Sequence, residues 1–306
     1  MKTMTEYWDL YDVNGRLIDA KMVRDEEIPE GAYHLSVNIW IVNSKNEILI
    51  QKRSPNKKKL PNIWVESAGG AVISGENSFE GAVRETEEEL GFKPDVVHLQ
   101  KIHNFILRNN TLVDVWMLRQ DIDVKDMYVD KEEVSEVMWV SFNKLMKLVR
   151  EGVFAPTILP GLFKVMENIA TRTHFGIYAL IEREDSILLI KKRRGPYSGM
   201  YDLPGGTPEG GETEVETLVR EVKEETGSYI SDHKFLGDVH VVFDGFKEAD
   251  GRKGFFFHSG KLYKCEIEGE PLDCISDLDS DGGFWVNKNE LNSGNSSALA
   301  LFALEK

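Results

Sequence analysis

The chain contains very little cysteine. Its 306 residues include two, Cys265 and Cys274. Two thiols are too few for a disulfide framework, and these two do not form the close pair that a structural zinc site uses. The cysteine content therefore predicts a reducing environment, and we expect a cytoplasmic protein.

The sequence also lacks long apolar runs. No stretch approaches the roughly 18 to 20 uninterrupted apolar residues of a membrane helix, and the mean hydropathy is −0.33. Glu6, Asp9 and Asp12 stand where a secretory signal needs basic and then apolar residues. We therefore expect neither a membrane span nor export.

Basic residues are outnumbered by acidic ones. The sequence has 37 lysines and arginines against 52 aspartates and glutamates, a formal net charge of −15. This excess opposes binding to the phosphate backbone of duplex nucleic acid. A small phosphorylated substrate would need a local positive feature or a metal ion. Duplex nucleic acid is therefore excluded as a partner, whereas a homodimer remains open.

The sequence repeats itself over a long distance. Residues 33–53 match residues 173–193, and the glycine pair at 69–70 matches the pair at 205–206. Solenoid repeats are much shorter, so a repeat of this length indicates two whole domains. The chain length also suits two domains.

We place the domain boundary near residue 170. One domain is predicted over residues 1–170 and the second over residues 171–306. In the first, Asn14-Gly15 between apolar residues predicts an N-terminal β-hairpin. In the second, residues 254–257 and 261–267 are predicted as strands.

A helix is predicted after each glycine pair. Apolar residues recur there at helical spacing and predict a buried face. These residues are Phe79, Val83, Thr86 and Leu90 in one copy and Val215, Leu218, Val219 and Val222 in the other. Both copies therefore alternate strands with helices.

The polar face of each predicted helix carries three glutamates at i, i+3 and i+4. They are Glu85, Glu88 and Glu89 in the first copy and Glu221, Glu224 and Glu225 in the second. Like charges at this spacing repel one another, whereas grouped carboxylate oxygens are the ligands that Mg²⁺ or Mn²⁺ prefers. A single such helix is usually only a solvated surface, but the recurrence of the same spacing favours a metal site.

Other matched residues extend this pattern. Glu76 and Arg84, like Glu212 and Arg220, lie about two helical turns apart. Each arginine is therefore expected to pair with and orient neighbouring glutamates. Basic clusters precede both glycine pairs, at 52–59 and 191–194, and are equally compatible with phosphate contacts and with solvated loops.

The segment from Gly70 through Glu76 to residues 84–92 closely resembles the Nudix box, and so does the segment from Gly206 to Ser228. Thr86 stands where the family prefers an aliphatic residue, and Ser228 replaces the closing apolar residue. Neither departure removes a charged position. The resemblance covers most of both halves.

This resemblance implies an α+β fold of two tandem Nudix-type α/β/α sandwiches with mixed sheets. It also implies a hydrolase that uses Mg²⁺ or Mn²⁺ to cleave nucleoside diphosphates linked to another moiety, releasing a nucleoside monophosphate and a phosphorylated product. Water would attack phosphorus beside the metal ion. One of the glutamates would act as base, but which one varies within the family.

The family pattern assigns roles to matching residues. The implied metal ligands are Gly70, Glu85, Glu88, Glu89, Gly206, Glu221, Glu224 and Glu225. The implied catalytic set comprises the same glutamates with Arg84 and Arg220, while Glu76 and Glu212 help to orient them. Additional candidate ligands or bases are Glu132, Glu133, Glu136, Asp277, Asp279 and Asp281, and candidate base-stacking residues are Trp40, Trp64, Trp116 and Tyr201.

Two alternative functions remain open. The first domain also resembles the isopentenyl-diphosphate isomerase branch, but it has no cysteine to supply that enzyme's acid. A nucleotide-sensing module with one silent domain is the second alternative, although both copies keep every carboxylate. The sequence motif at 202–206 is the more typical one, which slightly favours the second domain as catalyst. ADP-ribose, nucleotide sugars, dinucleoside polyphosphates and oxidised nucleotides are all candidate substrates.

Overall fold

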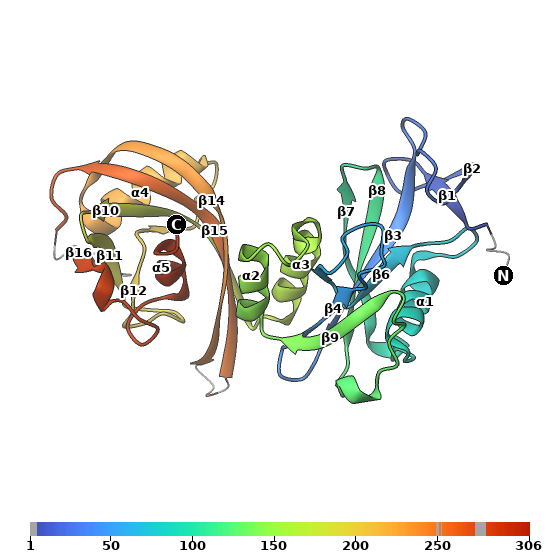
Figure 1. Cartoon of the computed structure of the whole chain (residues 1–306). Helices are drawn as coiled ribbons and strands as arrows, with labels where there is room; N and C mark the ends of the chain where they lie inside the picture. Colours follow the sequence, from blue (N-terminus) through green and yellow to red (C-terminus); the bar gives the residue numbers. More distant parts are fainter. Residues whose placement is uncertain (1–4, 249–250, 252, 273–279) are drawn as a thin grey trace. The chain divides into compact units, whose positions relative to one another are not determined.

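The structure, a computed structural model, describes residues 5–248, 251, 253–272 and 280–306. The chain divides into two compact units, unit 1 from Met1 to Asn168 and unit 2 from Ile169 to Lys306 (Figure 1). None of the helices in the described ranges is long and apolar enough to cross a bilayer.

A mixed sheet forms the centre of unit 1. Its strands are β1 (Tyr7–Tyr11), β2 (Leu17–Val23), β3 (Tyr33–Val42), β4 (Ile48–Arg53), β5 (Trp64–Val65), β6 (Ala68–Ala71), β7 (Leu99–Leu107), β8 (Thr111–Arg119) and β9 (Val134–Val140). Strand β3 runs parallel to β8 and antiparallel to β4 and β6. The predicted N-terminal hairpin is β1 and β2, which joins the sheet through β3.

Helices cover both faces of this sheet. They are α1 (Ser78–Leu90), α2 (Phe142–Arg150) and α3 (Leu159–Ile169), with 3-10 turns at Val96–His98, Val124–Asp126 and Pro156–Ile158. Side chains alternate along β3: Ile39 and Ile41 pack in the core under α1, whereas a Cβ on Gly161 of α3 would lie 2.9 Å from the Trp40 ring nitrogen. The sheet is therefore sandwiched between helices.

Unit 2 repeats this plan. Its strands are β10 (Arg172–Arg183), β11 (Ser186–Lys192), β12 (Tyr201–Asp202), β13 (Gly205–Gly206), β14 (Tyr229–Lys247), β15 (Lys253–Glu268) and β16 (Ser280–Asn287). Again the first long strand, β10, runs parallel to one neighbour, β15, and antiparallel to β11 and β13. The two strands predicted at 254–257 and 261–267 form one strand, because β15 pairs with β14 along almost its whole length.

Two helices give unit 2 its outer layers. Helix α4 (Glu214–Thr226) buries Leu218 and Val222 against one face of the sheet. Helix α5 (Ala298–Ala303) buries Leu299 and Ala300 in a second core cluster, and a 3-10 turn at Lys288–Glu290 precedes it. Both units are thus α/β/α sandwiches with mixed sheets, as the sequence predicts (Figure 1).

The first hairpin differs between the units by one residue. In unit 1, Val42 pairs with Ile48, whereas in unit 2 Glu182 pairs with Ile187. The turn of unit 2 is therefore one residue shorter. Gapless matching of residues 33–53 with 173–193 consequently fails in the second strand of the hairpin.

This shift changes which side chains correspond in the two units. By strand register, Gln51 of β4 matches Ile190 of β11, and not Lys191. Arg53 then matches Lys192. The correspondence matters because both Gln51 and Lys192 contact the candidate site.

The packing of α1 predicts that truncating the side chain of its last residue, Leu90, strongly lowers stability. Leu90 is fully buried, so Leu90→Ala should lower the free energy of unfolding of unit 1 by ~2–5 kcal/mol. Urea unfolding followed by circular dichroism would measure the change. Val97→Ala is the matched control, because Val97 is 78% exposed; an equal effect of both substitutions would contradict the packing described here.

Candidate active site

Helices α1 and α4, which carry the box glutamates, begin at well-defined capping residues. The Asn77 side chain accepts hydrogen bonds from backbone N–H groups of the first turn of α1, and Glu80 bonds back to the Asn77 N–H. Thr213 and Glu216 do the same for α4. Such capping boxes satisfy backbone donors that lack partners within the helix. Both helices therefore start at the same position relative to their glycine pair.

One arginine organises the box of unit 1. The Arg84 guanidinium donates from Nε to Glu76 at 2.9 Å and from one terminal nitrogen to Glu85 at 2.7 Å and to Glu88 at 3.0 Å. Its other terminal nitrogen donates to the Ala71 carbonyl at 2.9 Å. Arg84 therefore joins the loop, the helix and the end of β6.

Unit 2 has the same network around Arg220. Its guanidinium donates to Glu212 at 2.7 Å, to Glu221 at 3.0 Å and to Glu224 at 3.1 Å. It also donates to the Thr207 carbonyl at 3.1 Å. The pairing of each arginine with its neighbouring glutamates, expected from their spacing, is present in both units.

The buried stripe of each helix differs from the predicted one. Phe79 is 37% exposed and Val219 is 39% exposed, although both were expected to face the core. Thr86, Leu90, Leu218 and Val222 are buried as predicted. The stripes also contain Gly81, Ala82 and Glu89 in α1 and Thr217, Glu225 and Thr226 in α4. The helices are rotated so that one glutamate of each triplet points inward.

Glu89 and Glu225 are these inward glutamates. One carboxylate oxygen of Glu89 accepts from the Gly69 N–H at 2.9 Å and from the Gln51 amide at 2.8 Å. Glu225 accepts from the Gly205 N–H at 2.9 Å. Burial raises the pKa of each carboxyl to about 8, because desolvation disfavours the charged form. The inward glutamate of each helix therefore has other partners than the two remaining glutamates of its triplet, which bond to the arginine.

The second glycine of each pair permits close approach to the box. A Cβ on Gly70 would clash with the Glu85 carboxylate, and a Cβ on Gly206 would clash with Glu221. Burial also raises the pKa of Glu85 and Glu221. These two carboxylates therefore lie directly over the backbone at which the family pattern places a carbonyl ligand.

The oxygen atoms of the box glutamates and glycine carbonyls are of the kind that binds hard divalent cations. Carboxylate and carbonyl oxygens are what Mg²⁺ and Mn²⁺ prefer, and buried acids beside one another favour a cation. Within the described ranges, however, no group of three histidine, cysteine, aspartate or glutamate side chains is close enough to hold a metal ion.

Sequence reasoning missed a buried polar cluster in unit 1. The Asn38 amide donates to Glu66 at 2.5 Å, and both residues lie beside the glycine pair, since β3 pairs Asn38 with Gly69. Burial raises the pKa of Glu66 to about 7. The signal was available in part, because Asn38 interrupts the apolar residues in the second half of β3.

Unit 2 has different residues at the matching places. Buried Asp202 accepts from the Ser297 hydroxyl at 2.6 Å, and burial raises its pKa. The Tyr178 hydroxyl, at the position of Asn38, lies 2.6 Å from His258. Lys192 places its ammonium 3.6 Å from Glu225. The two candidate sites therefore share the box but differ in the surrounding residues.

The N-terminal hairpin is attached to the box loop of unit 1. Asp9 of β1 accepts from the Ser74 hydroxyl and the Gly75 N–H, both at 2.8 Å. Lys21 of β2 donates to the Ser74 hydroxyl at 2.6 Å. This loop leads to Glu76, so the hairpin helps to hold the residue that orients Arg84.

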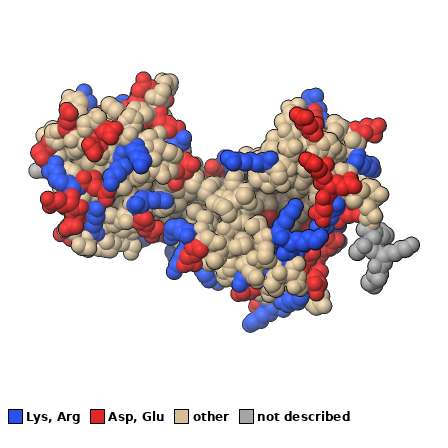
Figure 2. Space-filling model, turned by 45° about the horizontal axis from the view of Figure 1, so that its top comes forward, with Lys and Arg blue, Asp and Glu red and all other residues tan. Residues whose placement is uncertain are grey.

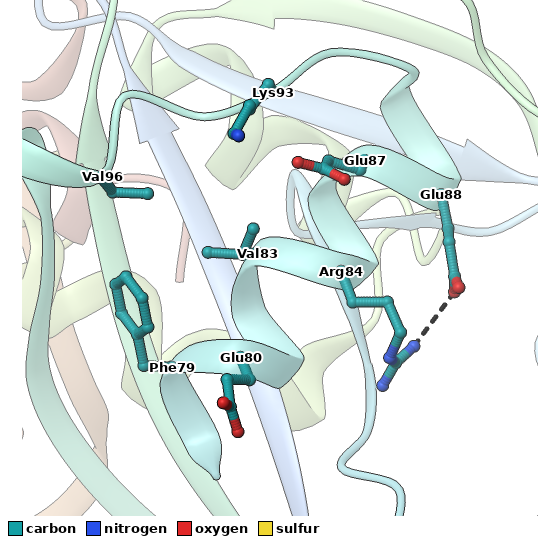
Figure 3. Close-up of a pocket in the computed structure, with 8 residues that line it drawn as sticks. All are labelled: Phe79, Glu80, Val83, Arg84, Glu87, Glu88, Lys93 and Val96. Atoms are coloured by element: carbon teal, nitrogen blue, oxygen red, sulfur yellow. Dashed lines mark hydrogen bonds and ion pairs between the residues drawn. The ribbon is translucent and has the colours of Figure 1, made fainter. Parts of the chain in front are cut away.

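A pocket lies on the outer side of α1. Figure 3 shows Phe79 and Val96 facing each other across it, with Val83 between them, while Arg84 extends away toward Glu88. Phe79 also makes an edge contact with Trp116, with ring centroids 5.7 Å apart. The partial exposure of Phe79 is thus explained by its place in this pocket wall.

The other candidate residues lie apart from the box or in the core. Glu133 pairs with Lys57 and Asp281 with Arg193, while Glu136 faces Lys52 across β4 and β9. Glu132 is exposed, and Asp277 and Asp279 lie outside the described residues. Trp40, Trp64 and Trp116 are buried and Tyr201 is half-buried, which suits packing better than base stacking.

Charges are mixed on the visible surface. Figure 2 shows lysine and arginine interleaved with aspartate and glutamate on the face that it draws. In the basic cluster of unit 1, Arg53 donates to the Lys59 carbonyl at 3.1 Å, and Lys52 lies 5.8 Å from the centre of the Trp64 ring. The basic residues near the glycines are thus distributed among several local contacts.

The two boxes agree with a known family. A family model described as the NUDIX domain matches residues 32–160 and again residues 170–302. The chain belongs to the Nudix family. Its two Nudix domains occur in tandem, and members of the family generally use divalent metal ions and act on small phosphorylated substrates.

The individual relatives align with 56% of this chain or less. An uncharacterized Nudix hydrolase of Listeria innocua is 34% identical over 170 residues, which is 56% of this chain and 99% of the relative. An ADP-ribose pyrophosphatase of Methanocaldococcus jannaschii is 54% identical over 52 residues, 17% of this chain and 31% of the relative. An isopentenyl-diphosphate Δ-isomerase of Photorhabdus laumondii is 29% identical over 147 residues, 45% and 78% of the two chains.

The buried Glu89 makes stability depend on pH. Its pKa rises from an ordinary value of 4.5 to about 8 on folding, so the folded state holds a proton that the unfolded chain has lost. Stability is therefore lost as the pH rises from about 5 to above 8. Glu89→Gln removes this loss, so the variant should gain at least ~1 kcal/mol relative to wild type over this range.

Urea unfolding at pH 5 and pH 8.5 in metal-free buffer would measure the difference. Exposed Glu87 on the same helix provides the control Glu87→Gln, which should follow wild type. A constant difference between Glu89→Gln and wild type at both pH values would show that Glu89 does not carry the raised pKa.

Proposed function

We propose that the protein is a metal-dependent pyrophosphohydrolase that cleaves the diphosphate linkage of nucleoside diphosphate derivatives. The products would be a nucleoside monophosphate and a phosphorylated second moiety. The duplicated box with every carboxylate present is the observation that carries this proposal. The match to an ADP-ribose pyrophosphatase over 52 residues supports a substrate of this class.

The proposed metal ligands are the box glutamates together with the carbonyls of Gly70 and Gly206. In unit 1 the glutamates are Glu85, Glu88 and Glu89, and in unit 2 they are Glu221, Glu224 and Glu225. A bound Mg²⁺ or Mn²⁺ ion supplies positive charge to the diphosphate and acidifies an attacking water. Glu85 and Glu88 are presented on one edge of α1 by Arg84.

The chain's own residues prepare the site for this chemistry. Arg84 keeps two carboxylates on one edge of α1 while Glu76 fixes the guanidinium from the other side. Glu89 is held in place by the Gly69 N–H, and its raised pKa suits a group that exchanges protons near neutral pH. Arg220, Glu212 and Glu225 have the same contacts in unit 2.

Two alternatives are less well supported. Isomerisation of isopentenyl diphosphate is suggested by relatives at 29% identity or less, but unit 1 has no cysteine. A sensing role for one unit requires a defective site, yet the arginine network is complete in both. Hydrolysis is therefore the function that the geometry supports best.

Replacement of one exposed box carboxylate should strongly reduce turnover in its own unit. Glu88→Gln and Glu224→Gln each exchange a charged carboxylate beside the arginine for a neutral amide, and each should lower kcat of the affected unit roughly 10²- to 10³-fold. Phosphate release, with and without added phosphatase, would be measured on a panel of nucleoside diphosphate derivatives with Mg²⁺ or Mn²⁺.

The single variants report the contribution of each unit, and the double variant tests whether the box glutamates are the site. Glu87→Gln is the matched control, because Glu87 is an exposed glutamate on the same helix that faces away from the Arg84 network. If Glu88→Gln and Glu224→Gln together retain full metal-dependent turnover, the box glutamates are not the site. If wild type turns over no panel member but binds nucleotides, the sensing alternative replaces hydrolysis.

A further inference from the structure

The two candidate sites differ in the charge of the side chain that contacts the inward glutamate. In unit 1, the Gly69 N–H and the Gln51 amide both donate to the same oxygen of Glu89. These donors carry no net charge. Glu89 is 5% exposed, so solvent screens its charge only weakly. The surroundings of Glu89 therefore favour the arrival of a cation.

In unit 2 a cation lies beside the inward glutamate. The Lys192 ammonium lies 3.6 Å from the oxygen of Glu225 that does not bond to Gly205. Glu225 is 3% exposed, so solvent screens this charge only weakly.

The hairpin register explains the difference. Ile190 takes the place of Gln51, so no amide reaches Glu225 from that position of β11. Lys192 takes the place of Arg53, whose guanidinium donates instead to the Lys59 carbonyl in the following loop. One residue less in the turn of unit 2 thus coincides with an exchange of a neutral partner for a charged one.

We propose that Lys192 is a positioning residue that makes unit 2 bind a divalent metal ion more weakly than unit 1. The ammonium compensates the Glu225 carboxylate and repels an incoming divalent ion, whereas the two groups that donate to Glu89 are uncharged. This inference rests on the proposed metal site in each unit. It predicts that unit 1 fills first as the metal concentration rises.

Metal binding can be measured without any substrate. Mn²⁺ would be titrated into the full chain, with free Mn²⁺ followed by electron paramagnetic resonance. Wild type should show two classes of site whose Kd values differ about tenfold, the scale expected from one nearby unit charge. Glu224→Gln should remove the weaker class and Glu88→Gln the tighter one.

Variants of neighbouring lysines test the role of the ammonium. Lys192→Gln should tighten the weaker class about tenfold, whereas Lys192→Arg, which keeps the charge, should leave the two classes distinct. Lys191→Gln makes the same change in net charge on an exposed side chain of the same strand, and should change neither class. Circular dichroism would verify that each variant is folded.

The outcomes separate this inference from the proposed function. If Lys192→Gln shifts the weaker class no more than Lys191→Gln does, or if the weaker class belongs to unit 1, the role of Lys192 is contradicted while the metal sites stand. If wild type binds no Mn²⁺, both the inference and the proposed metal-dependent hydrolysis are contradicted.

Discussion

The arrangement of each candidate site depends on one partly buried arginine side chain. Arg84 and Arg220 each bond to three glutamates and to one backbone carbonyl. Without that positive charge, carboxylates one turn apart on the same helix would repel one another. The guanidinium also joins its own helix, α1 or α4, to the loop before that helix and to the backbone directly after the glycine pair. Three segments of each unit are therefore held in register by one side chain.

A second constraint is the inward glutamate at the end of each box helix. Burying Glu89 or Glu225 is costly, because a charged carboxylate loses its hydration. The hydrogen bond that each carboxylate accepts from a glycine N–H offsets part of this cost. The remainder appears as a raised pKa. Such an acid destabilises the protein near neutral pH unless a cation or a proton compensates it. Such a loss of stability is expected at functional sites, where strongly shifted pKa values are common.

Much of this architecture could be predicted from the sequence, because charged residues at fixed spacing on a helix determine which neighbours they meet. The pairing of Arg84 with Glu76, Glu85 and Glu88 is an example, and so is the hairpin at Asn14-Gly15. The rotation of the helix could not be predicted, since apolar spacing alone placed Phe79 inside and gave no reason to bury Glu89. The partners Gln51 and Lys192 also escaped, because a turn that is one residue shorter shifts every later match in the strand.

A crystal structure of the full chain grown with Mn²⁺ would test the central claim, that the box glutamates of both units are the metal site. Anomalous scattering locates the ion independently of any activity. We expect an anomalous peak in each unit, roughly 2 Å from box carboxylate oxygens, with Arg84 and Arg220 displaced from at least one of the glutamates they now hold. Well-occupied peaks elsewhere, with both arginine networks unchanged, would contradict the account.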